Sequence, residues 1–134
     1  MTLQIECATE SASRATFTVA GVLDEDGARE LQEQVEAQLA RGRSEFLLDL
    51  RPLADCKILG RQGLRELQER FRRARVRTAY VAKTPRIRGM TLIVINGAND
   101  AGANTFVDAA AAAEWLASDV DRKALNVART EKNQ

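Results

Sequence analysis

The sequence predicts an α/β protein with a mixed β-sheet of about four to five strands, covered by about four helices. Segments with the period-2 alternation of strands take turns along the chain with segments that repeat apolar residues at helical spacing. The first two strand segments follow each other after a short turn, which predicts an opening antiparallel hairpin rather than a purely parallel sheet. The 134 residues, 45% of them hydrophobic, suffice for one domain with its own core.

The chain begins with the expected hairpin. Leu3, Ile5 and Cys7 alternate with polar residues, so we expect them on a buried face, with Cys7 filling the core. A polar turn separates them from a second alternating run at residues 15–21. Asp24 is then the expected N-cap of a helix that ends near Gly42. The apolar stripe of this helix consists of Ala28, Leu31, Val35 and Leu39.

The middle of the chain holds a third strand, a second helix and a fourth strand. Residues 46–50 (FLLDL) form a nearly continuous apolar run, which is typical of a strand buried on both faces. An amphipathic helix is expected after Gly60, and residues 76–82 (VRTAYVA) form the next strand. The buried face of this helix consists of Leu64, Leu67, Phe71 and Ala74.

A third helix is expected from Pro85, because the missing N–H of proline costs nothing in the first turn. Residues 90–95 (MTLIVI) fit a strand by propensity and a helix by spacing, and both alternatives stay open.

The last elements are a strand candidate at 104–107 and an alanine-rich helix. Asp108 is the expected cap of this helix, and Trp115 is expected to anchor it to the sheet. The sequence thus predicts one domain over residues 1–120 and a polar tail over residues 121–134 that frays.

Composition excludes several kinds of chemistry. The chain has no histidine, so catalytic triads and metal sites that need imidazole are excluded. Cys7 and Cys56 are too few and too far apart for a zinc ribbon or a disulfide framework, and the glycines form no phosphate-binding loop. Asp49 and Asp55 are the remaining candidates for a hydrolase, although we expect Asp49 to cap a helix or pair with an arginine. We expect no enzyme activity, no metal and no cofactor.

The charge is unevenly distributed. The net charge is +1, yet residues 61–88 carry ten basic and two acidic residues, whereas residues 1–60 carry six and eleven. We expect the arginines to coat the solvent face of a helix and to pair with the acidic first helix. Nucleic-acid binding is not expected, because no aromatic platform accompanies the charge. No apolar run could span a membrane and no signal peptide is present, which predicts a cytoplasmic protein.

The order of segments resembles that of the SpoIIAA-like (STAS/Sec14-type) small bacterial domains. The resemblance rests on FLLDLRPL, Gly60 at the start of a helix, VRTAYVA and TPRIRG, flanked by DEDGARELQEQVEAQL and FVDAAAAAEWL. It extends over nearly all of residues 3–117 and implies a non-catalytic interaction or regulatory domain of a bacterial protein.

The resemblance also shows a departure from the family. Members that antagonise anti-sigma factors are switched by phosphorylation of a serine in an Asp-Ser-Ser-Gly type turn before the second helix. The matching residues here are Lys57, Ile58, Leu59 and Gly60, and only the glycine is retained. Neither Ile58 nor Leu59 carries a hydroxyl group, so this switch is absent. We expect both side chains to be buried; if exposed, they would mark a protein interface or the lip of an apolar pocket.

Two function hypotheses follow. In the first, the chain binds a protein partner or a second copy of itself. The candidate surface consists of Asp55, Cys56, Lys57, Ile58, Leu59, Gly60, Arg61 and Arg65. In the second, the chain carries or senses a small apolar or lipid-like ligand. Residues 90–95 and the second helix would then line the pocket, and Arg86 and Arg88 would hold an acidic head group.

Overall fold

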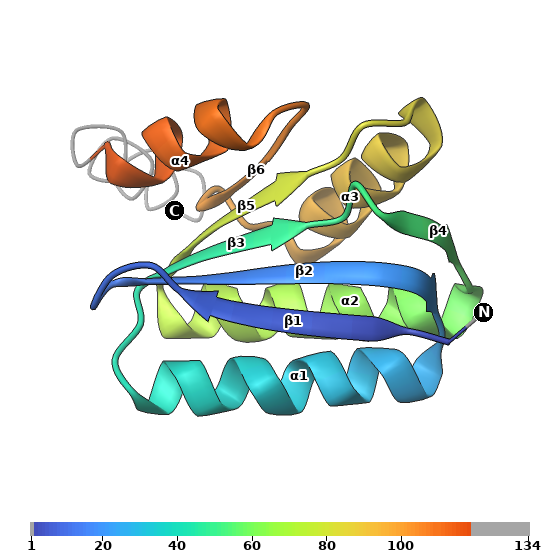
Figure 1. The fold of residues 1–134 in the computed structure, drawn as a ribbon, viewed down its shortest axis with the longest axis horizontal. Helices are drawn as coiled ribbons and strands as arrows, with labels where there is room; N and C mark the ends of the chain where they lie inside the picture. Colours follow the sequence, from blue (N-terminus) through green and yellow to red (C-terminus); the bar gives the residue numbers. More distant parts are fainter. Residues whose placement is uncertain (1, 119–134) are drawn as a thin grey trace.

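The structure, a computed structural model, describes residues 2–118 (Figure 1). Its elements are β1 (Gln4–Thr9), β2 (Arg14–Leu23), α1 (Glu25–Ala40), β3 (Glu45–Asp49), β4 (Leu53–Cys56), α2 (Ile58–Ala74), β5 (Arg77–Val81), α3 (Pro85–Ala98), β6 (Ala103–Phe106) and α4 (Ala109–Ala117). The predicted α/β class and the four helices are confirmed, with six strands in place of four to five. The tail predicted for residues 121–134 lies outside the described residues.

The strands form one mixed sheet in the order β1-β2-β3-β5-β6. β1 and β2 make the predicted antiparallel hairpin, and the pairs β2–β3, β3–β5 and β5–β6 are parallel. The short strand β4, which the sequence analysis missed, pairs in parallel with the end of β2, where the register shifts after Gly21. β4 therefore brings Asp55 and Cys56 to the end of the sheet where β2 stops.

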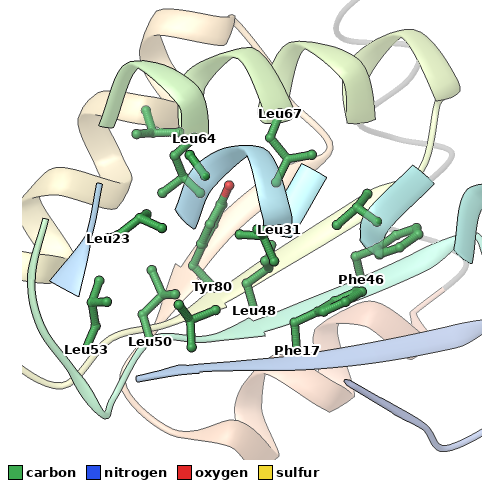
Figure 2. Packing of buried hydrophobic residues seen from close by; sticks show 14 of the residues in the cluster. Phe17, Leu23, Leu31, Phe46, Leu48, Leu50, Leu53, Leu64, Leu67 and Tyr80 are labelled. Carbon is green, nitrogen blue, oxygen red and sulfur yellow. The ribbon is translucent and has the colours of Figure 1, made fainter. Parts of the chain in front are cut away.

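Three helices share one face of the sheet. Side chains from α1, α2 and α3 join those of β2, β3 and β5 in the main core, and α4 packs on the opposite face (Figures 1 and 2). Alternate residues of β2 are buried, as the period-2 pattern predicts. The largest fully buried side chains of the main core are Phe17, Leu23, Leu31, Phe46, Leu48, Leu50, Leu64, Leu67, Phe71 and Tyr80.

The helix starts follow the local sequence signals. The Asp24 carboxylate accepts the Gly27 N–H at 2.8 Å, and the Asp108 carboxylate accepts the Ala111 N–H at 2.8 Å, so both predicted caps are confirmed. Thr84 caps α3, with Pro85 in the first turn. Residues 90–95, left open by the sequence, are helical.

A buried chain of hydrogen bonds links α2, β5 and the loop after α3. The Tyr80 hydroxyl donates to Gln68 Oε1 at 2.6 Å, and Figure 2 shows it directed toward α2. Gln68 Nε2 in turn donates to the Asp100 carboxylate at 2.8 Å. The same carboxylate accepts the backbone N–H of Gly102 at 2.8 Å. These bonds satisfy polar groups that would otherwise be costly to bury.

Two expectations for single residues have opposite outcomes. Trp115 packs against Phe106 with ring centroids 5.6 Å apart, and the Arg77 guanidinium lies 3.8 Å from the Trp115 ring centroid. The predicted anchoring of the last helix is therefore confirmed. The predicted burial of Cys7 is wrong, because Cys7 is exposed. It lies on the edge strand β1, and period-2 alternation identifies a face of the strand but not whether a helix covers it.

The arginines of residues 61–88 pair only in part as expected. Arg70 of α2 reaches Glu36 of α1 at 2.6 Å, which joins the two helices. Arg65, by contrast, pairs within its own helix, and Arg77 is buried beneath α4 instead of lying on the solvent face.

Candidate functional site

The first turn of α2 lies directly against the end of β2. The backbone N–H of Lys57 donates to the Leu23 carbonyl at 2.8 Å. A Cβ atom at Gly60 would collide with that same carbonyl and would lie 3.2 Å from the Cα of Asp24. Only glycine fits such a close approach of two backbone segments. Gly60 thus occupies the inward position of this turn.

Ile58 and Leu59 are turned to solvent as a result. Their exposed fractions are 68% and 51%, so the expectation that they are buried is wrong. The inward position of the turn belongs to Gly60, which leaves no room for a larger side chain there. The predicted turn from Asp55 to Gly60 is in fact the end of β4, the N-cap residue Lys57 and the first turn of α2.

A groove of about 390 Å³ separates this turn from α3. Six of the residues singled out in the sequence line it: Asp55, Cys56, Lys57, Ile58, Arg61 and Arg86. Met90 and Ile93, from the stretch 90–95 expected to line a ligand pocket, also line it, whereas the contributions of Pro85, Ile87 and Gly89 were missed. The groove thus brings together two segments that are far apart in the sequence, and most of its apolar lining comes from α3.

The other candidate residues lie outside the groove. Leu59 lines a smaller hollow of about 150 Å³ between α1 and α2. The Arg65 side chain lies against α3 at Gly97, and its Nε is 3.5 Å from Glu69. Arg88 is half-buried and does not line the groove, so of the two predicted anion contacts the structure places Arg86 alone in its lining.

The groove has an uneven charge. Arg86 forms an ion pair with Asp55 at 2.7 Å, which neutralises both groups. Lys57 and Arg61 have no carboxylate within 4.0 Å among the described residues. Helix α2 has no side chain that caps its N-terminus, whereas α1, α3 and α4 each have one. No acidic residue lies in the first turn of α2. Positive charge therefore prevails along the α2 side of the groove.

The groove offers no activated nucleophile. Burial and the neighbouring Asp55 carboxylate raise the pKa of the Cys56 thiol to about 11, against the opposing effect of Arg61 and Arg86. The thiol therefore stays protonated and weakly nucleophilic near neutral pH.

The two carboxylates considered for a hydrolase are both held by arginines. Asp55 is paired with Arg86, and Asp49 is paired with Arg51 at 2.7 Å, as predicted for Asp49. Burial raises the pKa of Asp49, but hydrogen bonds from Arg51 outweigh it and leave the pKa below its ordinary value. In the part of the chain that the structure describes, no three metal-ligating side chains gather into a site.

One sequence signal accounts for the α3 wall of the groove. A helix that covers one face of a sheet needs a single apolar stripe, yet residues 90–95 are apolar at five of six positions. Met90, Val94 and Ile95 pack into the core, whereas Leu92 and Ile93 are exposed. This surplus of apolar residues on α3 provides the outer wall of the groove at Ile93.

No family model and no curated protein matches the sequence. Solved structures do match. An anti-sigma factor antagonist from Mycobacterium paratuberculosis is 17% identical with a TM-score of 0.69, covering 87% of this chain and 96% of its own. The unphosphorylated anti-sigma factor antagonist SpoIIAA is 11% identical with a TM-score of 0.64, covering 83% of this chain and 94% of its own.

A third similar structure is an uncharacterized protein of the DUF3478 family from Shewanella loihica, described as having a SpoIIAA-like fold. It is 18% identical with a TM-score of 0.61, covering 85% of this chain and 93% of its own. The chain therefore has the SpoIIAA-like (STAS) fold that its sequence resembles. No helix of the described part is long and apolar enough to cross a membrane.

Proposed function

From its SpoIIAA-like fold and the groove at α2, we propose that the chain is a non-catalytic interaction domain that binds a protein through this groove. The observation that carries the proposal is the exposure of Ile58, 68%, at the first turn of α2. Large aliphatic side chains exposed together at a groove are characteristic of surfaces that become covered in a complex. The similar anti-sigma factor antagonists are, by their descriptions, proteins that act on another protein.

The proposed domain works without a phosphorylated residue in the first turn of α2. Ile58 and Leu59 precede Gly60 at this position and offer no hydroxyl group to a kinase. Binding at the groove is then controlled by the availability of the partner and not by phosphorylation of this turn.

The experiment is site-directed photo-crosslinking in cells that express the protein from its own gene. A photoreactive residue replaces Ile58 in one strain and Val107 in another. Val107 is a matched control, because it is 52% exposed and lies outside the groove. We expect a discrete protein adduct from position 58 that is absent from position 107. Equal adducts from both positions, or none from position 58, would refute the proposal.

Purified protein provides the complementary measurement. We expect Ile58→Asp to weaken the complex with the captured partner without changing the far-UV circular dichroism spectrum. If Ile58→Asp unfolds the protein, the side chain belongs to the core and the proposed surface is wrong.

A second candidate function is supported by the same groove. Its volume of about 390 Å³ lies within the range of small-molecule sites, and it combines Met90 and Ile93 with Lys57, Arg61 and Arg86, of which Arg86 is already paired with Asp55. This arrangement suits a small apolar or lipid-like ligand with an acidic head. Native mass spectrometry separates the alternatives: added mass that is lost on denaturation supports the carrier, whereas an integer multiple of 14.8 kDa supports a homodimer or larger self-assembly.

A further inference from the structure

We infer that the partner of this groove is an acidic amphipathic segment, whose apolar side chains enter between Ile58 and Ile93 and whose carboxylates meet Lys57 and Arg61. This inference rests on the proposed function, because it specifies the chemistry of the partner at the same surface.

The apolar part of the inference comes from the two rims of the groove. Ile58 on α2 and Ile93 on α3 are 68% and 59% exposed, and both line the groove. Pro85, Ile87 and Met90 line the groove as well. An aliphatic side chain that enters here contacts apolar groups from both helices. Grooves of this kind receive apolar anchors at helical spacing from an amphipathic segment.

The acidic part comes from the charges that the protein leaves uncompensated. Of the three cations in the groove, Arg86 is already paired with Asp55 at 2.7 Å. Lys57 and Arg61 have no carboxylate within 4.0 Å in the range from residue 2 to residue 118. An apolar segment without acidic groups would remove water from these two cations without giving them hydrogen bonds or opposite charge in exchange, which is unfavourable. Carboxylates beside the apolar anchors restore the lost interactions and make the surfaces complementary.

A second copy of this chain fits the groove less well. Helix α1 carries several exposed carboxylates, among them those of Glu25, Glu30 and Glu33. Of the large apolar residues of the same helix, Leu31 and Val35 are fully buried, and Leu39 is partly buried against the core. Helix α1 can therefore offer carboxylates to a neighbouring molecule but no large apolar anchor.

A lipid bilayer also fits less well. Seating the groove in a bilayer would dehydrate the ion pair between Arg86 and Asp55, whose side chains remain accessible to water. The groove lining also lacks the tryptophan and tyrosine side chains that are enriched at membrane interfaces.

The test uses two fluorescein-labelled helical peptides of equal length. Both carry leucines at positions i, i+3, i+4 and i+7, and the flanking positions are glutamates in one and lysines in the other. Binding is followed by fluorescence anisotropy at low ionic strength. We expect the acidic peptide to bind at least about tenfold more tightly than the basic one. Equal affinities, tighter binding of the basic peptide, or no binding of either would overturn the inference.

Variants of the protein locate the effect. Ile58→Asp is expected to weaken binding of the acidic peptide by about tenfold or more, and Lys57→Glu/Arg61→Glu is expected to reverse the preference between the peptides. The matched control, Arg72→Glu/Arg73→Glu, makes the same change of charge at exposed positions in the last turn of α2. If the control reverses the preference equally, the attraction is due to net charge and the inferred site is wrong.

Two further results identify which idea fails. Binding to phosphatidylglycerol vesicles that is abolished by Ile58→Asp, without binding of the acidic peptide, would assign the surface to a bilayer instead. A protein adduct at position 58 whose partner binds the Lys57→Glu/Arg61→Glu variant as tightly as the wild type would leave the interaction function standing and refute the acidic chemistry. Absence of both adduct and peptide binding would refute both proposals.

Discussion

Replacing Gly60 by alanine should destabilise the protein, although alanine is the better helix former. A Cβ atom at this position would collide with the Leu23 carbonyl oxygen and would lie 2.8 Å from the Leu23 carbonyl carbon. Both obstacles are backbone atoms, so they cannot move aside as a flexible side chain could. Forcing an extra group into a closely packed site costs about 1–3 kcal/mol. The helix propensity of alanine returns up to about 1 kcal/mol.

With the full return from helix propensity, the expected net loss for Gly60→Ala is up to about 2 kcal/mol. Gly89→Ala is the matched control, because a Cβ atom at Gly89 of α3 would meet nothing within 4 Å. That variant should gain about 1 kcal/mol from helix propensity. At about 4 °C per kcal/mol for a domain of this size, the two melting temperatures should lie on opposite sides of the wild type.

The assay is urea unfolding followed by far-UV circular dichroism, with the slope m compared between variants. An unchanged m with a lower midpoint for Gly60→Ala would support a loss of native-state stability. A Gly60→Ala variant as stable as Gly89→Ala would refute the close approach of α2 to the end of β2. It would also remove the reason given for the exposure of Ile58.

Three other predictions concern buried or paired groups. Tyr80→Phe should lower the free energy of unfolding by about 1–3 kcal/mol in urea titration, because Gln68 Oε1 loses the hydroxyl that donates to it at 2.6 Å. Asp49→Asn should be less stable than the wild type at pH 7. The folded-state pKa of Asp49 is lowered from 3.8, so this difference should shrink as the pH falls below 3.8, and a constant difference would contradict the assignment. In a Cys7→Ser background, alkylation of Cys56 by iodoacetamide, measured by mass, should accelerate about tenfold per pH unit between pH 8 and 10, since its pKa is about 11; a rate that levels off near pH 8 would contradict this.

The sequence predicted best those features that depend on neighbouring residues. The caps at Asp24 and Asp108 and the helical start at Pro85 each follow from chemistry within one turn of the chain. The alternation along β2 has an equally local origin, because successive side chains of a strand point to opposite faces.

The failures have a different cause. The exposure of Cys7 depends on which helix covers which strand, and the exposure of Ile58 depends on a backbone contact between Gly60 and Leu23. Strand β4 has four residues, too few for a clear period-2 pattern. For the candidate site, the residues from Asp55 to Arg61 were identified by resemblance to a known turn, and residues 90–95 were expected to line a separate ligand pocket. That the two segments face each other across one groove required the tertiary arrangement.

The hydrogen bonds among Tyr80, Gln68 and Asp100 bear on how quickly a partner can bind. Gln68 lies toward the end of α2, and Asp100 follows the end of α3, so the network ties together the two helices that line the groove. A spacing fixed in this way means that the groove exists before the partner arrives. Docking then needs little rearrangement of the domain, and we expect an association rate limited by orientation and electrostatic steering rather than by opening of the two helices.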